Sequence, residues 1–471
     1  MTIASSTLVV AVVVAMSLGM KAQDHSQHQQ PEKKTPVLGA PSDHAQHTAP
    51  KEQESEIGVT GIPEFGSEHA RMRLEEFEAL AMKHNPTLPQ AEALMRSAEG
   101  RRRQAGMWAN PVVGYSGEEI RGGALRGGQH GAFIEQTFPI SGRLGLSKSV
   151  AEKAVRIAEI AKEEQRVRVL TAVKVAYYRV LAAQELLKTE RAFAELASAA
   201  VQTSRRLQNV GQQDETEVLQ AEVEFEQARV AVAQQENRLR RTWQELATIA
   251  GRPDLPLSAV GGRLDQKLPE LDEEAVIKRI ESEGPAIRLS DASVARAEAA
   301  TSRARRAWVP DLQVRAGIQQ NRELLEGGRP VGAQGFAEVG VELPIFNRNQ
   351  GGIQAASAEF EQARQERERV RLELRQRAAE VIEQHRNARL TVDRYRENMI
   401  PRAKRSYDLM LQRWGQMGAS YPQVLLAQRT LFSLQAGYIN ALEQLWINSV
   451  ALEGFMLTEG LEAPREGLGT D

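Results

Sequence analysis

Apolar side chains recur along most of the chain with the period of long amphipathic helices. In the second half they follow an unbroken spacing of four and three residues, which is the heptad pattern of a coiled-coil seam. The positions of this seam are Leu374, Ala378, Val381, His385, Ala388, Val392, Tyr395 and Met399. The pattern predicts a long helix over 353–399 that packs against its neighbours, with His385 as a polar position of the seam rather than a metal ligand.

The first half contains a longer segment of the same kind. No Pro or Gly interrupts residues 146–209, so we predict one continuous helix there. At a rise of ~1.5 Å per residue this helix spans about 95 Å. A helix of this length is not stable alone, so it must lie beside others in a bundle or wall.

Two pairs of short segments alternate apolar and polar residues instead, which predicts β-strands. We expect these strands at 112–118, 132–138, 312–319 and 336–343. The apolar face of the last one is formed by Ala337, Val339, Val341 and Leu343. Two-faced strands of this length fit a half-buried sheet in water or a membrane β-barrel with a polar interior. The segments 120–130 and 321–334 are rich in Gly and polar residues and are expected to be loops.

The order of these elements occurs twice along the chain. The Phe-Pro-Ile turn at 138–140 is matched by Leu-Pro-Ile at 343–345, and an arginine follows each within three residues, Arg143 or Arg348. Apolar positions that recur 206 residues later are Val218, Ala221, Phe225, Ala228 and Val232, which correspond to Val424, Ala427, Leu431, Leu434 and Tyr438. A repeat of this length indicates duplication of a whole fold unit. We expect a first repeat over 69–270, a second over 271–459 and a C-terminal tail over 460–471.

The composition narrows the classes of function. The chain has 471 residues, with 60 Lys or Arg and 62 Asp or Glu, so its net charge of -2 gives no basis for nucleic-acid binding. Because it has no cysteine, disulfides, thiolate metal sites and a lipid anchor on an N-terminal Cys are excluded. A mean hydropathy of -0.43 excludes a membrane protein built of spanning helices. No nucleotide-binding or hydrolase motif occurs, so we predict neither an enzyme nor a cofactor.

The N-terminal residues differ from the rest. The apolar run at 8–18 predicts a secretory signal peptide over 1–22, and residues 23–68 have the composition of a disordered tail. Two copies of an Asp-His-x-Gln-His pattern in this tail contain His25, His28, His44 and His47. Imidazole pairs beside a carboxylate suit Zn, Cu, Ni or Co, so weak metal capture is one hypothesis. A low-complexity tail in which histidine is incidental is the other.

The number of strands bears on function. One chain supplies about four strands, which are too few to close a barrel, and open strand edges are not tolerated in lipid. A membrane sheet of this kind therefore requires several copies that share one barrel. A long helical wall joined to a shared barrel forms a conduit.

Over 74–459 the sequence resembles the TolC-like outer-membrane efflux proteins. The matching features are the duplicated unit, the paired strands with their Pro-Ile turns, and two helix-hairpin tips at 206–211 and 413–418. The resemblance implies a mainly α fold with a small β part: a helical coiled-coil tunnel in the periplasm and a transmembrane β-barrel shared by a homotrimer, four strands per chain. It also implies a location in the cell outer membrane, and tips that dock on a periplasmic adaptor coupled to an inner-membrane pump of the resistance-nodulation-division type.

The resemblance also assigns roles to residues near the tips. The expected adaptor contacts are Asn209, Val210, Gly211, Gln416, Met417 and Gly418. Glu217 falls where family members carry an acid that narrows the tunnel, whereas the comparable position of the second copy is Gln423, so that acidic ring is missing there. Simpler roles exist for the same residues. Glycine tolerates positive φ at a helix reversal, and an acid suits a helix start.

These inferences predict the outer-membrane channel of a tripartite efflux system, a passive conduit for heavy-metal cations. The doubled histidine pattern of the tail motivates the choice of metals. An outlet for drugs or other organic compounds and a type I secretion channel use the same conduit and stay open as alternatives. A soluble periplasmic coiled-coil adaptor or scaffold is a further alternative, although it would not need duplicated two-faced strands.

Overall fold

The computed structural model describes residues 71–120, 128–324, 328–416 and 418–465. All of them belong to one compact unit, Gly61–Asp471. The predicted signal peptide and the tail with His25, His28, His44 and His47 lie outside the described residues, and so does Met417.

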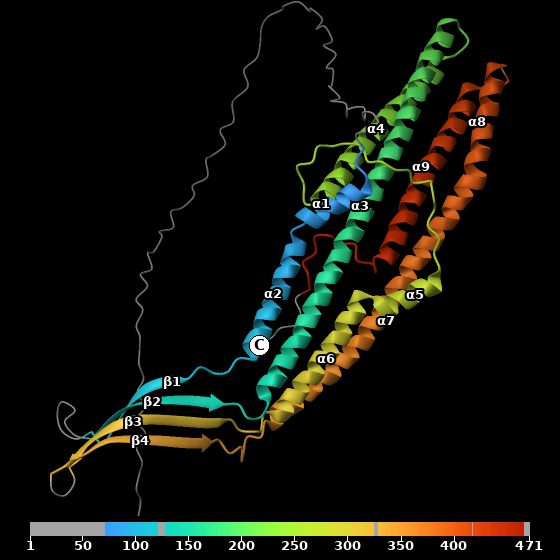
Figure 1. The fold of residues 1–471 in the computed structure, drawn as a ribbon. Helices are drawn as coiled ribbons and strands as arrows, with labels where there is room; N and C mark the ends of the chain where they lie inside the picture. Colours follow the sequence, from blue (N-terminus) through green and yellow to red (C-terminus); the bar gives the residue numbers. More distant parts are fainter. Residues whose placement is uncertain (1–70, 121–127, 325–327, 417, 466–471) are drawn as a thin grey trace, which may run out of the picture. The chain divides into compact units, whose positions relative to one another are not determined.

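Helices and strands follow one order twice (Figure 1). The first copy consists of α1 (Leu74–His84), α2 (Thr87–Ala105), β1 (Val112–Glu118), β2 (Gln129–Phe138), α3 (Arg143–Asn209) and α4 (Glu215–Ile249). The second consists of α5 (Glu273–Glu283), α6 (Pro285–Arg306), β3 (Leu312–Leu324), β4 (Pro330–Val341), α7 (Gln350–Arg394), η3 (Tyr395–Met399), α8 (Ile400–Gly415) and α9 (Tyr421–Glu453). The mainly helical class, the small sheet and the internal duplication are confirmed. Within the described residues, no helix is both long and apolar enough to cross a membrane.

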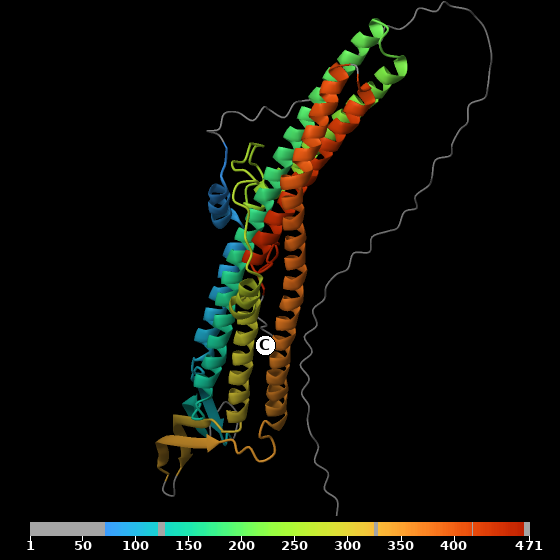
Figure 2. The same ribbon diagram turned by 90° about the vertical axis from the view of Figure 1, so that its right-hand side faces the viewer.

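The longest helix is α3, with 67 residues, and it begins shortly before its predicted start. Its buried side is rich in small residues, such as Ala172, Ala176 and Ala183, which allow α4 and α9 to pack closely against it. α6 lies along α3 and α7, so the helices run side by side (Figures 1 and 2). As expected for a helix of this length, neighbours cover α3 along most of its course.

An aromatic cluster joins α1 to the two long helices of the first copy. Phe77 is fully buried and meets Tyr177 and Trp243 edge-on, with ring centroids 6.1 and 5.8 Å apart. The indole N–H of Trp243 donates to the Leu255 carbonyl at 3.2 Å, so the buried ring keeps its polar group satisfied. Three of the chain's few aromatic side chains therefore pack together where α1, α3 and α4 meet.

The second predicted long helix changes its geometry near its end. α7 stops at Arg394 and continues through the π-helical segment η3 into α8. The prediction of a regular seam to Met399 is wrong here, because Val392 is fully buried whereas Met399 is 47% exposed. A wide π turn adds a residue and rotates the positions that follow around the helix axis. Pro401, which has no amide hydrogen, lies in the first turn of α8, directly after this segment.

The buried place predicted for His385 is confirmed. Its side chain is 5% exposed, and its Nε2 has no hydrogen-bond partner. Burial lowers the pKa of this imidazole below its ordinary value of 6.5, the charge of Arg389 lowers it further, and Glu273 acts in the opposite direction. The unfolded chain keeps the ordinary pKa, so it binds more protons than the folded protein as the pH falls through that value. The folded state therefore loses stability on acidification.

We expect His385→Leu to weaken the acid sensitivity of the fold. The melting temperature of the wild type should fall between about pH 7.5 and about pH 5, partly because the buried imidazole must become charged. In His385→Leu we expect the melting temperature to fall less over this pH range. His84→Leu, which replaces an exposed histidine of α1, is the control and should show the same fall as the wild type. The measurement is thermal unfolding in detergent at several pH values. An identical pH slope in wild type and His385→Leu would contradict the assignment.

The four strands form one antiparallel sheet in the order β1-β2-β3-β4. The predicted bounds of three strands are wrong, because β2 begins at Gln129, β3 extends to Leu324 and β4 covers Pro330–Val341. Parts of the expected loops 120–130 and 321–334 are therefore strand, and Leu343 lies beyond the end of β4. The segments are expected to be loops because they are rich in Gly and Gln, but these residues pair across the strands.

Candidate functional site

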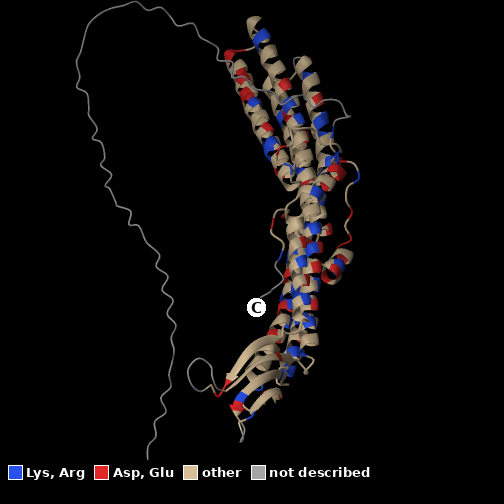
Figure 3. Cartoon of the chain, turned by 60° about the vertical axis from the view of Figure 1, so that its left-hand side comes forward, with Lys and Arg blue, Asp and Glu red and all other residues tan. Residues whose placement is uncertain are grey.

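The sheet has two chemically different faces. The apolar face consists of Val113, Tyr115, His130, Ala132, Ile134, Gln136, Phe138, Leu312, Val314, Ala316, Ile318, Gln320, Ala333, Ala337, Val339 and Val341. These paired rows of the described strands contain no Asp, Glu, Lys or Arg, and Figure 3 shows charge concentrated on the helices. Val113, Ile318 and Val339 are 74%, 73% and 70% exposed. Apolar surface of this extent marks a contact with a membrane or another chain.

The opposite face, called the polar face below, carries the charged and amide side chains. Its members other than glycine are Val112, Ser116, Glu118, Gln129, Phe133, Glu135, Thr137, Gln313, Arg315, Gln319, Asn321, Gln334, Phe336 and Glu338. Glu135 and Thr137 of this face alternate along β2 with Ile134, Gln136 and Phe138 of the apolar face. A sheet with one uncharged apolar face and one polar face separates lipid from water.

Two phenylalanines interrupt the polar face in equivalent places. The Phe133 ring covers Gly114 on β1, where an added Cβ would lie 2.5 Å from the ring. The Phe336 ring covers Gly317 on β3 in the same way, with a distance of 2.6 Å. The two pairs lie 203 residues apart, and in both hairpins a Glu follows the Phe by two residues. Sequence reasoning missed this pair, although the repeated Phe-x-Glu was the signal for it.

The strands connect to the long helices through matched turns. Gly142 and Asn349 precede α3 and α7 and both adopt left-handed backbone conformations, with φ of 71° and 60°. The guanidinium of Arg143 donates to the Asp311 carboxylate at 2.7 Å, which ties the two repeats together. Each of these left-handed residues follows a Pro-Ile turn that the sequence singled out, and each directly precedes the start of its long helix.

The first hairpin tip joins α3 to α4. Gly211 has φ of 73°, and the amide of Gln212 donates to the Leu207 carbonyl at 2.9 Å, which closes α3 as predicted. Asp214 caps α4 by accepting from the Glu217 amide at 3.0 Å. Val210 is 68% exposed, so it is available to a partner.

The second tip joins α8 to α9 and uses different chemistry. The amide of Gly418 donates to the Arg413 carbonyl at 2.8 Å, but Gly418 does not adopt a positive φ. The predicted left-handed role is therefore wrong for Gly418. This connection has one residue fewer between its glycine and the helix cap at Ser420 than the first tip has. The Trp414 and Tyr421 rings pack 5.5 Å apart across its base.

The two residues predicted to narrow a tunnel occupy equivalent positions. Glu217 and Gln423 are the third residues of α4 and α9. The Gln423 side chain accepts from the Ser420 amide at 3.3 Å in a capping box, so it is used locally. Glu217 lies in the first turn of its helix, where an acid is favourable. A role of either residue in a tunnel stays a prediction.

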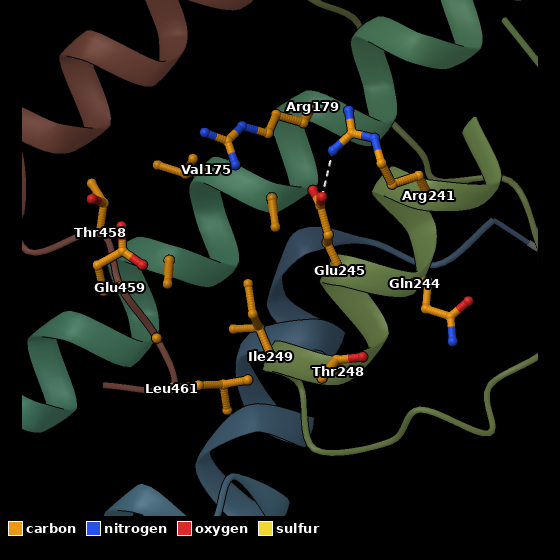
Figure 4. Close-up of a pocket in the computed structure, with 13 residues that line it drawn as sticks. Val175, Arg179, Arg241, Gln244, Glu245, Thr248, Ile249, Thr458, Glu459 and Leu461 are labelled. Atoms are coloured by element: carbon orange, nitrogen blue, oxygen red, sulfur yellow. Dashed lines mark hydrogen bonds and ion pairs between the residues drawn. The ribbon is translucent and has the colours of Figure 1, made fainter. Parts of the chain in front are cut away.

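A pocket of about 590 Å³ opens between α3, α4 and the segment that follows α9 (Figure 4). Arg179, Arg241, Glu245 and Glu459 lie on its walls, and the Arg241 guanidinium pairs with the Glu245 carboxylate. Among the described residues, no group of three or more His, Cys, Asp or Glu side chains could hold a metal ion. Arg241 and Glu245 therefore neutralise each other on the wall of this pocket.

Comparison with known proteins decides the family. The family described as outer membrane efflux protein matches residues 79–252 and 276–456, one stretch in each copy of the duplicated order. The chain belongs to this family. The predicted resemblance is confirmed, and membership places the protein in the outer membrane rather than among soluble periplasmic adaptors.

Relatives of this efflux protein include proteins named for metal resistance. The chain is 25% identical over 394 residues to the cobalt-zinc-cadmium resistance protein CzcC of Cupriavidus metallidurans, with 83% of this chain and 91% of that protein covered. It is 25% identical over 304 residues to the nickel-cobalt-cadmium resistance protein NccC of Alcaligenes xylosoxydans xylosoxydans, with 63% and 66% covered.

Solved structures share the fold at low sequence identity. A structure of CusC, described in terms of folding and transmembrane channel formation, matches with a TM-score of 0.68 and 16% identity, covering 81% of this chain and 91% of CusC. The outer membrane protein VceC of Vibrio cholerae matches with a TM-score of 0.66 and 17% identity, covering 83% and 97%. The arrangement of helices and strands is therefore that of these outer-membrane proteins.

Proposed function

We propose that this protein is the outer-membrane channel of an efflux system and passively conducts heavy-metal cations to the exterior. The observation that carries the proposal is the two-faced sheet, whose exposed apolar side and polar side are what the wall of a membrane β-barrel needs. The names of CzcC and NccC, which refer to cobalt, zinc, cadmium and nickel, support cations as the cargo. Passive conduction requires no catalytic group and no cofactor.

Loss of metal tolerance tests this proposal. Deletion of the gene should lower the tolerated concentration of at least one of Co, Zn, Cd, Ni, Cu or Ag, because the outlet for that cation is removed. A plasmid copy of the gene should restore growth. Unchanged tolerance to all six, with raised sensitivity to organic compounds, would contradict the choice of metals and favour a drug outlet.

We also propose a homotrimer, because four strands do not close a barrel. An exposed apolar stripe on α4 supports contact between copies. Leu219, Val223 and Val230 are 53%, 57% and 56% exposed and line a groove of about 490 Å³. The described part of the chain leaves this stripe uncovered, and a neighbouring copy would bury it.

Charged substitutions on this stripe should prevent assembly. In Leu219→Glu with Val223→Glu, two carboxylates would have to leave water at the interface, so we expect the trimer to dissociate. Gln220→Glu, at an exposed position beside the stripe, is the control and should leave the trimer intact. Light scattering of the detergent-solubilised protein measures the oligomer. A trimer in the double variant would contradict this interface.

The hairpin tips are the proposed contacts to partners. Asn209, Val210 and Gly211, together with Gln416 and Gly418, stand at the ends of the two helix pairs, where a periplasmic adaptor could reach them. Met417 belongs to the same proposal. The adaptor would connect the channel to an inner-membrane pump of the resistance-nodulation-division type. Glu217 and Gln423 would then lie close to the inner mouth of the tunnel.

A further inference from the structure

One row of paired residues across the polar face carries three charged side chains. Glu135, Arg315 and Glu338 lie directly opposite one another on β2, β3 and β4. Apart from Glu118, they are the only Asp, Glu, Lys or Arg residues in the described paired rows of either face. Two acids and one base leave one net negative charge in this row of every copy.

The base of this row is held in place by the two phenylalanines. The Arg315 guanidinium carbon lies 4.0 Å from the centre of the Phe133 ring and 5.8 Å from that of Phe336. Its Nη1 lies 3.7 Å from the Glu338 carboxylate. Both rings are seated over glycines of the neighbouring strands, so the cation has a built position between two aromatic faces.

Exposure differs between the base and the acid that it meets. The Arg315 side chain is 31% exposed, because the rings cover it, whereas the Glu338 side chain is 61% exposed. The positive charge is therefore kept close to the sheet, and the Glu338 carboxylate reaches further toward the water on the polar face. Glu135, the partner of Arg315 in the other direction, adds a second carboxylate to the row.

We propose that Glu135, Arg315 and Glu338 form a charged ring inside the channel that makes it prefer hydrated cations to anions. This inference rests on the proposed function, because the row becomes a ring only when copies share a barrel. Repetition of a net negative row around a water-filled wall raises the local concentration of cations. The preferred class of cargo is then a small hydrated cation that is attracted without being coordinated, in agreement with the lack of a metal-holding cluster among the described residues.

Ion selectivity in planar lipid bilayers tests the ring. The full-length protein is reconstituted, and the ratio of K⁺ to Cl⁻ permeability is obtained from the reversal potential in a KCl gradient. Glu135→Gln with Glu338→Gln removes two negative charges from the row of each copy and leaves Arg315, so it should lower this ratio by about tenfold, the effect of two unit charges at ~6 Å in water. Arg315→Gln should raise the ratio. Glu274→Gln with Glu283→Gln, which removes two exposed carboxylates from α5, is the control and should leave it unchanged.

The outcomes separate this inference from the proposed function. If all variants open pores of wild-type conductance with an unchanged permeability ratio, the ring is refuted and the channel stands. If the wild type opens no pores, the proposed function fails and the ring fails with it. A cross-strand pair that only stabilised the sheet would change the melting temperature in Glu135→Gln with Glu338→Gln, but not the selectivity.

Discussion

Arg168→Leu should lower the free energy of unfolding by about 3–5 kcal/mol. Arg168 and Glu164 are 4% and 2% exposed, and their side chains form an ion pair at 2.7 Å on α3. The substitution leaves the Glu164 carboxylate in the interior without this partner. Arg465, whose Nε lies 3.5 Å away, has a half-exposed side chain and does not replace a buried guanidinium.

The same residue also fastens the segment that follows α9. Arg168 donates to the Glu462 carboxylate, and the Gln165 amide donates to the Glu462 carbonyl at 3.0 Å. Further along, the Asn85 amide donates to the Gly460 carbonyl at 3.2 Å. Loss of Arg168 therefore weakens the contact between the end of the chain and the first repeat, in addition to leaving a buried charge unpaired.

Denaturant unfolding followed by far-UV circular dichroism measures this loss. Arg156→Leu, which breaks an exposed pair with Glu159 on the same helix, is the control and should cost at most about 1 kcal/mol. Glu164→Leu with Arg168→Leu should recover much of the stability, because no charge is left unpaired. An Arg168→Leu protein as stable as the Arg156→Leu control would contradict the buried pair.

Val210→Glu should abolish metal tolerance and leave the fold intact. Val210 is 68% exposed at the α3–α4 tip, so the structure itself does not depend on its side chain. If the adaptor binds there, a carboxylate in the contact must be desolvated without a partner, which strongly opposes binding. Cells with Val210→Glu should therefore grow in metal no better than the deletion strain.

The control for this variant carries the same charge elsewhere on the same helix pair. Gln234→Glu lies at an exposed position of α4, away from the tip, and should keep full tolerance. Immunoblots of outer membranes establish that both variants are present in equal amounts. Wild-type tolerance in Val210→Glu, at a normal protein level, would show that this tip does not make the contact.

The long helices and the two-faced strands could be predicted because local rules determine them. Residues 146–209 lack Pro and Gly and repeat small apolar residues, and α3 follows almost the same bounds. The strands of the second copy alternate most regularly, as Val339 and Val341 of β4 show. Because the order of helices and strands occurs twice, each copy also indicates the elements of the other.

What the sequence did not predict depends on contacts between distant residues. The π segment η3 accompanies the packing of the Tyr395 hydroxyl against Gly437 of α9, where an added Cβ would lie 2.8 Å away. The true length of β3 depends on its pairing with β2 and β4. Arg315 lies near two phenylalanine rings only because β2, β3 and β4 pair in a particular register, and a local sequence pattern does not predict that register.

The release of loaded metal from living cells tests the central claim most directly. Wild-type and deletion cells are loaded with radioactive Co²⁺ or Zn²⁺ and transferred to metal-free medium, and the label that stays in the cells is followed with time. We expect wild-type cells to lose the label, deletion cells to retain it, and a plasmid copy of the gene to restore the loss. Equal release of both metals from wild-type and deletion cells would contradict the conclusion that this protein conducts heavy-metal cations out of the cell.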